Sequence, residues 1–191
     1  MQSVIIAVAA IVFLFIVGFW LWFAEYLWCV FVRHQAPCVA SSWNLKRATV
    51  NAIRQFYPNA KRIIEIGSGH GGLARYVARR VDADVVGVEN MPFAALVSKI
   101  GDGFCFARSK TMWMDAFDYL DEVHEKFDVA IAYLGPKLTP KLTKYKNKIK
   151  VLIAMDFEIP KLKPVKIINL RGSIVYGDKK YPHRLFIYEF K

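Results

Sequence analysis

Cysteine and histidine are scarce in this sequence, with three and four residues among 191. Cys29, Cys38 and Cys105 are odd in number and form no C-x-x-C pair, so neither a zinc site nor a disulfide framework is supported. The histidines are scattered and lack metal-ligand spacing. We therefore expect no bound metal, and cysteines that serve as small apolar side chains.

Acidic residues are also a minority, since 16 Asp and Glu stand against 27 Lys and Arg, a formal net charge of +11. Charge of either sign is missing from Ser3 to Ala24, where the residues are mostly apolar. About 20 apolar residues in a helix, each rising 1.5 Å, cover the roughly 30 Å hydrocarbon core of a bilayer. This run excludes an ordinary soluble protein, and one such run excludes a multi-pass transporter.

The apolar run predicts a membrane anchor that is not cleaved. A signal peptide has a basic start and an apolar core of about 7–15 residues, whereas here only Met1–Ser3 precede a longer run. We expect residues 1–32 to form a transmembrane anchor ending in an interfacial aromatic segment. Positive charges follow the run and none precedes it. The positive-inside rule therefore predicts a single-pass protein with its C-terminal domain on the cytoplasmic side, or the matrix side of an organelle.

Strand-like and helix-like patterns alternate after the anchor. Residues 33–60 are predicted to be a connector followed by a helix from about Trp43 to Tyr57, capped by Ser41 or Ser42. Residues 61–191 predict an α/β fold, a Rossmann-like and mostly parallel sheet with an antiparallel hairpin at its C-terminal end. The expected strands are Arg62–Ile66, Asp84–Val88, Phe104–Ala107, Phe127–Leu134, Lys150–Asp156, Lys166–Tyr176 and Arg184–Phe190. The expected helices are Leu73–Val81, Pro92–Ile100 and Ala116–His124, with Lys137–Tyr145 helical or looped.

A glycine-rich turn follows the first expected strand and opens a helix. Glycine accepts positive φ and lets a ligand approach the backbone, and the N–H groups of the helix face that ligand. About 20 residues later a second strand ends at Glu89, whose carboxylate can accept hydrogen bonds from ribose hydroxyls. We therefore expect a nucleotide-containing cofactor. Its predicted contacts are Glu65, Gly67, Ser68, Gly69, Gly71, Glu89 and Asn90.

Two cofactors fit this turn. Gly67-x-Gly69-x-x-Gly72 matches the dinucleotide pattern, a weak signal by itself. Glu65-x-Gly67-x-Gly69-x-Gly71 matches the first motif of class I S-adenosylmethionine-dependent methyltransferases. The methyl donor is favoured because Glu65 places a carboxylate near a sulfonium and an amino group. A dehydrogenase would also need a substrate domain, for which no residues remain.

The order of motifs resembles that of the small membrane-anchored protein-lysine methyltransferases that act on the c subunit of ATP synthase and on the ADP/ATP carrier. The similarity covers about residues 1–190, and the matching segments are the apolar N-terminal segment, P-C-V-A-S (37–41), E-I-G-S-G-H-G-G (65–72), G-V-E-N-M-P (87–92), D-V-A-I-A-Y-L-G-P (128–136) and F-E-I-P-K-L-K-P (157–164). His70 and Gly72 stand where the family has Asp and Arg, and Ala40 replaces a Pro.

The resemblance implies a lysine acceptor on a membrane protein and a substrate channel beside Pro37 and Ser41. Tyr133, Leu134 and Pro136 follow the fourth expected strand, at the edge where open α/β sheets bind ligands, and are predicted to line the acceptor site. Tyr133 is either a hydrogen-bonding group for the amine or a packed aromatic. Ser41 is either a substrate contact or a helix cap.

The basic residues gather in one stretch, Lys137–Lys150, where six lysines occur without an intervening acid. A polybasic surface beside a membrane gains about 1 kcal/mol per cation from an anionic leaflet. Because an anchor is already expected, we interpret this stretch as facing an anionic lipid surface rather than nucleic acid. A solvated basic face remains the alternative.

Three functions therefore stay open from the sequence. The first is a membrane-anchored protein-lysine N-methyltransferase that uses S-adenosylmethionine and acts on a membrane-embedded protein. The second is a methyltransferase of a lipid or of a membrane-associated small molecule. The third is a catalytically inactive methyltransferase-like assembly factor. It is suggested by the departures at His70 and Gly72 and by T-M-W (111–113), which begins with Thr111 where the resembling family often has D-L-[F/W].

Overall fold

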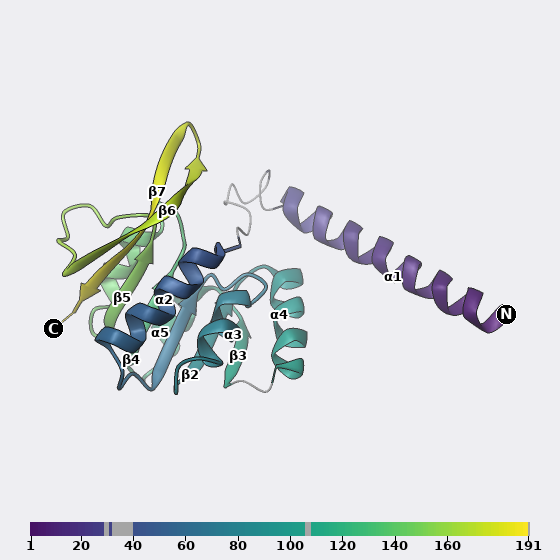
Figure 1. Cartoon of the computed structure of the whole chain (residues 1–191), viewed down its shortest axis with the longest axis horizontal. Coiled ribbons are helices and arrows are strands. Elements are labelled where there is room, and N and C mark those ends of the chain that lie inside the picture. Colours follow the sequence, from purple (N-terminus) through teal and green to yellow (C-terminus); the bar gives the residue numbers. More distant parts are fainter. Residues whose placement is uncertain (29–30, 32–39, 106–107, 191) are drawn as a thin grey trace. The chain divides into compact units, whose positions relative to one another are not determined.

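The computed structural model describes residues 1–28, 31, 40–105 and 108–190 (Figure 1). The chain divides into two compact units, Met1–Val39 and Ala40–Lys191. The helix that follows the predicted connector therefore belongs to the same unit as the sheet.

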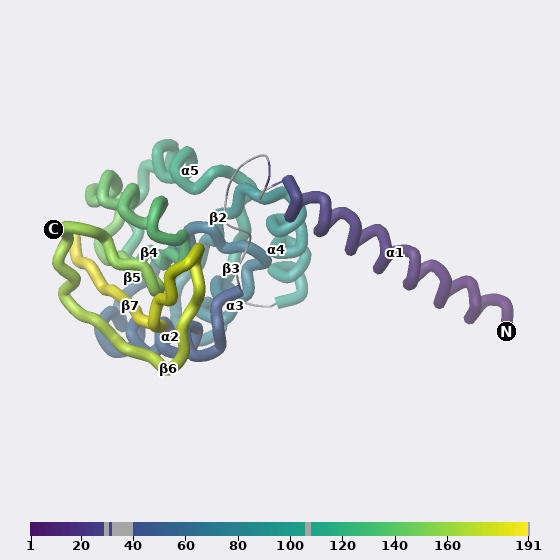
Figure 2. The backbone as a smooth tube through the Cα atoms, turned by 90° about the horizontal axis from the view of Figure 1, so that it is seen from above, coloured from purple at the N-terminus to yellow at the C-terminus, as the bar shows by residue number. Residues whose placement is uncertain are grey.

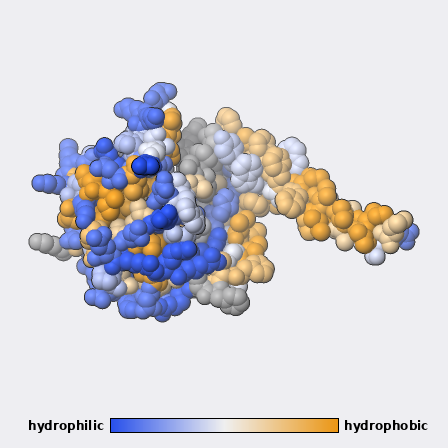
Figure 3. Space-filling view, viewed as in Figure 1, coloured by the Kyte–Doolittle hydropathy of each residue, from blue (hydrophilic) through white to orange (hydrophobic). Residues whose placement is uncertain are grey.

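The first unit contains the helix α1, Gln2–Leu27. Its 26 residues have a mean hydropathy of 3.0 in their most apolar window, which is long and apolar enough to cross a membrane. Figure 3 shows an apolar surface along most of this helix. Aromatic side chains cluster in its second half, where Phe19 stacks on Phe23 and Trp22 contacts Tyr26. Length and composition alone do not distinguish such an anchor from a signal sequence.

The second unit is built on a seven-stranded sheet with the order β3-β2-β1-β4-β5-β7-β6. The strands β3, β2, β1, β4 and β5 pair in parallel, whereas β7 is antiparallel to both β5 and β6. The predicted Rossmann-like sheet with a C-terminal antiparallel hairpin is confirmed. The strand bounds are β1 Arg62–Ile66, β2 Asp84–Glu89, β3 Ser109–Trp113, β4 Phe127–Ala132, β5 Ile149–Met155, β6 Lys166–Tyr176 and β7 Lys179–Glu189.

The terminal hairpin is longer than the sequence predicts. Strand β7 begins at Lys179 rather than at Arg184, and Tyr176 pairs with Lys179 across a turn at Gly177, which has a φ of +59°. The register shifts between Asn169 and Ser173 of β6. Figure 1 shows the tip of the hairpin extending beyond the rest of the sheet.

Helices cover both faces of the sheet (Figure 2). Helices α2 and α3 lie on one face, while α5 and the 3₁₀ helix η2 lie on the other. Helix α2 begins where the Ser42 hydroxyl accepts a hydrogen bond from the backbone N–H of Leu45 at 3.3 Å, an N-cap. The helix bounds are α2 Trp43–Phe56, α3 Gly72–Ala78, α4 Pro92–Phe104, α5 Ala116–Glu122 and η2 Thr139–Tyr145.

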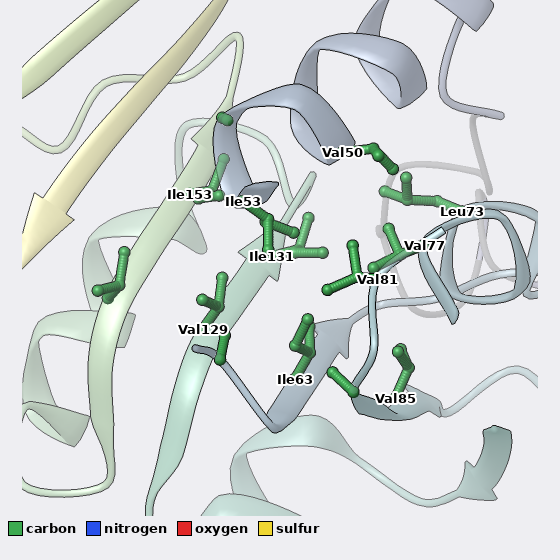
Figure 4. Packing of buried hydrophobic residues seen from close by; sticks show 14 of the residues in the cluster. Val50, Ile53, Ile63, Leu73, Val77, Val81, Val85, Val129, Ile131 and Ile153 are labelled. Atoms are coloured by element: carbon green, nitrogen blue, oxygen red, sulfur yellow. The ribbon is translucent and has the colours of Figure 1, made fainter. Parts of the chain in front are cut away.

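Two apolar cores follow from the alternation of side chains along each strand. Ile63, Val129 and Ile153 point toward α2 and α3, where they meet Ile53 and Val77 (Figure 4). Their sequence neighbours point to the other face and pack on α5 and η2. Because both faces are covered, the central strands are mostly apolar on both sides.

The expected strand Phe104–Ala107 is wrong. Helix α4 continues through Phe104, and the strand is Ser109–Trp113. The carboxylate of Asp102, near the end of α4, accepts hydrogen bonds from the hydroxyls of Ser109 (2.8 Å) and Thr111 (2.6 Å) and so ties the helix to the strand. As an edge strand with only Thr111 buried, β3 lacks the apolar run that identifies the central strands.

Candidate active site

Three predicted site residues meet at one edge of the sheet. Glu65 lies near the end of β1, Glu89 is the last residue of β2, and Tyr133 directly follows β4. Because β1 pairs in parallel with both β2 and β4, the carboxyl ends of the three strands are neighbours. The strand order reverses between β1 and β4, and that is where open α/β sheets bind ligands.

The glycine turn after β1 is fixed to the neighbouring strand. The backbone N–H groups of Gly67 and Ser68 both donate to the carbonyl oxygen of Val88, at 2.9 and 3.0 Å. Gly67, Gly69 and Gly71 have φ values of +72°, +54° and +70°. This left-handed backbone favours glycine, so the turn requires the residue type that the sequence supplies.

Two glycines also allow close approach. A Cβ on Gly67 would lie 2.7 Å from Cδ2 of Leu134, in the segment after β4, and a Cβ on Gly71 would collide with the hydroxyl of Ser98. Leu134 therefore covers the glycine turn directly. The predicted cofactor loop and the predicted acceptor segment are in contact.

Glu89 holds the turn from the second strand. Its Oε2 accepts a hydrogen bond from the backbone N–H of Gly69 at 2.7 Å, and its Oε1 accepts one from the N–H of Met91 at 2.8 Å. The side chain is 6% exposed. Glu89 thus shapes the loop as well as presenting a carboxylate at the strand end where ribose hydroxyls are bound in this type of sheet.

Glu65 is the most unusual charged group of the site. It is 5% exposed, and its Oε2 and the hydroxyl of Ser68 are buried without a hydrogen-bond partner in the described part of the chain. Burial raises the pKa of Glu65 to about 8, although a backbone hydrogen bond at Ala74 and the positive charge of Lys46 oppose this shift. A buried oxygen without a partner is costly, so Glu65 Oε2 retains an unused capacity to accept a hydrogen bond.

Lys46 of α2 reaches the same loop and was not among the predicted site residues. Its Nζ lies 3.1 Å from the position that a Cβ on Gly72 would take. Where the resembling family has Arg, this chain therefore has a glycine beside a lysine from another element. Lys46 thus adds a positive charge near the buried carboxyl of Glu65, which keeps its proton in the ligand-free protein below about pH 8.

Asn90 is held beside the end of β3. Its side-chain amide donates to Asp115 at 3.5 Å, and its backbone carbonyl oxygen accepts a hydrogen bond from the Trp113 indole at 3.4 Å. Asp115 also caps α5 by accepting from the N–H of Phe117 at 2.8 Å. Asn90 is thus anchored at the edge near Glu89, but its role toward a ligand stays a prediction.

The segment after β4 has a defined turn. Gly135 has a φ of +74°, and its carbonyl oxygen accepts hydrogen bonds from both the N–H (3.1 Å) and the hydroxyl (2.8 Å) of Thr139. A Cβ on Gly135 would lie 3.2 Å from the ring of Tyr176 in β6. The turn places Leu134 and Pro136, both half-buried, between the glycine loop and the terminal hairpin.

Sequence reasoning missed two residues that contact Tyr133 and its neighbours. The hydroxyl of Tyr133 donates to Oδ2 of Asp156 at 2.9 Å, and Nδ1 of His183 contacts the same oxygen at 2.8 Å. Asp156 follows β5 and His183 lies on β7. One signal in the sequence indicates Asp156, the expected end of the fifth strand, because the carboxyl ends of parallel strands share one edge of the sheet. No signal in the sequence indicates His183.

The two residues predicted to line the substrate channel precede α2 in the sequence. Pro37 lies outside the described residues. Ser41 is half-buried immediately before Ser42, which is the residue that caps α2. Ser41 is therefore not the cap, and its contact with substrate stays a prediction. Among the described residues, no group of three or more His, Cys, Asp or Glu could hold a metal ion.

No protein-family model matches the sequence, and no curated protein matches it. Solved structures do match. An RNA methyltransferase from Salinibacter ruber in complex with S-adenosyl-L-homocysteine aligns with a TM-score of 0.62 and 17% identity, over 80% of this chain and 94% of its own.

Two further structures align over similar lengths. A putative O-methyltransferase from Klebsiella pneumoniae has a TM-score of 0.62 and 15% identity, over 81% of this chain and 84% of its own. A precorrin-6y C5,15-methyltransferase from Geobacter metallireducens has a TM-score of 0.60 and 12% identity, over 80% and 90%. At these identities the comparisons show that the sheet unit has the Rossmann-like methyltransferase fold.

The buried carboxyl of Glu65 predicts a stability that depends on pH in the ligand-free protein. Its pKa is about 8 when folded and 4.5 as an ordinary carboxyl. Between pH 4.5 and about 8 the carboxyl of Glu65 therefore loses its proton in the unfolded chain but keeps it in the folded chain. The free energy of unfolding contributed by Glu65 falls as pH rises through this window, by up to about 1.4 kcal/mol per pH unit.

Urea unfolding of the full chain in detergent micelles from pH 5 to 8, compared with Glu65→Gln, measures this contribution. The variant should become steadily more stable relative to the parent as pH rises. Glu122→Gln, at an exposed position of α5, is the matched control and should keep a constant difference. A constant difference for Glu65→Gln as well would show that Glu65 ionises normally.

Proposed function

We propose that this chain is a membrane-anchored, S-adenosylmethionine-dependent protein-lysine N-methyltransferase that acts on a membrane protein. The observation that carries the proposal is the buried, unpartnered carboxyl oxygen of Glu65 beside the glycine turn, in a methyltransferase fold. The structurally similar RNA methyltransferase from Salinibacter ruber was crystallised with S-adenosyl-L-homocysteine, the demethylated form of this cofactor.

The residues at the sheet edge fit the cofactor. Glu65 would receive the amino group of its methionine part, and Lys46 the carboxylate. Glu89 would receive the ribose hydroxyls, and the Gly67–Gly71 turn lets the cofactor approach the backbone. Lys46 thereby supplies the cation that the family's Arg would supply at position 72. The cofactor, when bound, contributes a sulfonium methyl group that is open to in-line attack by a nucleophile.

The acceptor would approach from the segment after β4. Leu134 covers Gly67, so Tyr133, Leu134 and Pro136 lie beside the cofactor turn. Methyl transfer needs alignment and an amine that has lost its proton. An ordinary lysine has a pKa of about 10.4, and removal of its amine from water lowers this value because the charged form is desolvated.

Membrane attachment is supported by α1, whose length and hydropathy suffice to span a bilayer. The positive charges that follow it in the sequence favour a cytoplasmic or matrix side for the sheet unit. A short connection between an anchor and an enzyme raises the effective concentration of acceptors in the same membrane. This favours a lysine on an integral membrane protein over a soluble acceptor.

A surface for anionic lipid is proposed on η2 and its flanks, where Lys137, Lys141, Lys144 and Lys146 are exposed. The last two lysines of the predicted stretch have other partners. Lys148 donates to the carbonyl oxygens of Leu120 (2.5 Å) and Asp121 (2.9 Å), and Lys150 pairs with Asp128 at 2.7 Å. The proposed lipid surface therefore comprises the four lysines that form no ion pair with another described residue.

Calorimetry tests the cofactor. S-adenosylmethionine should bind the full chain in micelles with micromolar affinity, while NAD should not bind. Glu89→Ala should weaken binding by about 10–100-fold, because a charged hydrogen-bond partner of the ligand and of the loop is lost. Lys61→Ala, on an exposed ion pair with Asp82, is the control. Unchanged affinity in Glu89→Ala would remove Glu89 from the cofactor site, and no binding by the parent would favour the inactive assembly factor.

The fate of a labelled methyl group tests the acceptor. Membranes from cells that lack the gene are incubated with purified protein and methyl-tritiated S-adenosylmethionine, then separated into lipid extract and protein. Label should appear in protein and, after acid hydrolysis, in methylated lysine. Glu65→Gln should reduce it strongly. Label in the lipid extract would favour the lipid or small-molecule methyltransferase instead.

Vesicle binding tests the lipid surface. Residues 40–191, which form one compact unit, should bind vesicles containing phosphatidylserine but not neutral ones, and binding should fall between about 50 and 200 mM salt. Changing Lys137, Lys141, Lys144 and Lys146 to Gln should weaken binding roughly tenfold or more. The same change at the exposed lysines 99, 110, 179 and 180 is the matched control. Equal losses in both variants would mean that general charge, not this surface, attracts the lipid.

A further inference from the structure

Asp156 occupies a strained and fully buried position at the carboxyl edge of the sheet. It follows β5 with a φ of +61°, a left-handed conformation that is uncommon for a residue other than glycine. Its side chain is 0% exposed. The backbone of Arg184 in β7 holds it from both sides: the N–H of Asp156 donates to the Arg184 carbonyl at 2.8 Å, and Oδ1 accepts from the Arg184 N–H at 3.0 Å. Strain of this kind gathers at functional sites.

The second carboxylate oxygen of Asp156 determines the direction of two hydrogen bonds. Oδ2 accepts from the hydroxyl of Tyr133 at 2.9 Å and contacts Nδ1 of His183 at 2.8 Å. A carboxylate can only accept, so the Tyr133 proton and a proton on Nδ1 both point at Asp156. The lone pairs of the Tyr133 oxygen are then directed away from Asp156. Burial and the negative charge of Asp156 raise the pKa of Tyr133 well above its usual range, so the hydroxyl keeps its proton.

The surroundings of Asp156 favour positive charge. Its ion-pair partner among the described residues is His183, and no lysine or arginine pairs with it there. Aromatic rings extend from Tyr133 across to the hairpin: Phe157 stacks on Tyr133 at 6.1 Å and meets Tyr176 and Tyr181 edge-to-face at 5.6 and 5.1 Å. Faces of aromatic rings attract cations. We call Tyr133, Asp156, Phe157, Tyr176, Tyr181 and His183 the Asp156 cluster.

The Asp156 cluster adjoins the glycine turn of the proposed cofactor site. Tyr133 immediately precedes Leu134, which contacts Gly67 of the cofactor turn, and Gly135 lies against the Tyr176 ring. The chain thus connects the proposed cofactor site to the cluster within three residues, 133–135. A hydrogen-bond acceptor at Tyr133 would meet a substrate atom that approaches the methyl group.

We propose that the Tyr133 hydroxyl, oriented by Asp156 and His183, accepts a hydrogen bond from the N–H of an incoming primary amine. The cluster would thereby select lysine-like acceptors over anionic ones and over groups without a hydrogen to donate. Tyr133 is the residue that meets the acceptor, whereas Asp156 and His183 are positioning residues. This inference rests on the proposed methyltransferase function and specifies its acceptor.

The transfer step is balanced without any further reactant. The acceptor ammonium first releases one proton to water. The lone pair of the free amine then forms the N–C bond to the methyl group while the S–C bond breaks and its electron pair stays on sulfur. The products are a methylated ammonium ion and a neutral thioether. Tyr133 exchanges no proton in this step.

Two matched ligands test the inference without knowledge of the protein acceptor. Each is an S-adenosylhomocysteine analogue with nitrogen in place of sulfur. In the amine analogue this nitrogen is joined through a CH₂CH₂ linker to the nitrogen of a butylamine. The N–H of the butylamine then lies where the acceptor nitrogen would lie. In the methylene analogue a CH₂ replaces that N–H. Calorimetry with the full chain in micelles gives the affinities of both analogues and of S-adenosylhomocysteine.

The parent protein should bind the amine analogue about tenfold or more tightly than the methylene analogue, as a hydrogen bond to a charged group implies. Tyr133→Phe should reduce this preference to within about threefold and leave the affinity for S-adenosylhomocysteine nearly unchanged. Asp156→Asn should also lower the preference for the amine analogue. An amide can donate as well as accept, so the Tyr133 proton is no longer required to point at residue 156. Tyr57→Phe is the matched control, because that tyrosine also donates to a carboxylate, Glu189, at 2.9 Å.

The outcomes separate the inference from the proposed function. Binding of S-adenosylhomocysteine without amine preference, or a preference that survives in Tyr133→Phe, overturns the role of the Asp156 cluster and leaves the cofactor site intact. Failure to bind S-adenosylhomocysteine defeats the proposed function itself. Thermal melting shows whether each variant folds. If Asp156→Asn does not fold, the milder Tyr133→Phe change still decides the test.

Discussion

The contact between the glycine turn and the strand beside it determines the rest of the site. Gly67 and Ser68 donate to one carbonyl of β2, and this pulls the chain back across the end of β1. The turn can close only because three glycines adopt positive φ, and the space left by Gly67 admits Leu134. A larger residue at position 67 would separate the cofactor turn from the acceptor segment. The hydrogen bonds that hold the turn at Gly67 therefore also keep it in contact with Leu134.

The central part of the fold could be predicted from the sequence because its signals are local and repeated. Strands β1, β4 and β5 are mostly apolar and largely buried, and the turn at Gly67–Gly71 lies between a strand and a helix. The edge strand β3 was misplaced because polar side chains of the strand bind Asp102, an interaction across the α4–β3 connection that no periodicity reveals. The acidic strand ends, Glu65 and Glu89, were found because their positions follow from the strand bounds.

The missed residues share a different property: each comes from an element far along the chain. Lys46 reaches the glycine turn from α2, before the sheet begins, and His183 reaches Asp156 from the last strand. Their chemistry depends on tertiary placement, and a lone lysine or histidine in a sequence carries no signal of its partner. The raised pKa of Glu65 was equally invisible, because it follows from burial rather than from residue type.

The position of β7 between β5 and β6 also affects the order in which the parts of the protein can form during synthesis. A chain is synthesised from its N-terminus, and its domains fold as their residues become available. Helix α1 is complete long before Arg184 and His183 exist, yet Asp156 needs both of them to adopt its place. Helix α1, which is long and apolar enough to cross a membrane, is therefore complete while the edge of the sheet around Asp156 is still unfinished. The carboxyl edge of the sheet is thus completed last, when the final strand of the hairpin has been synthesised.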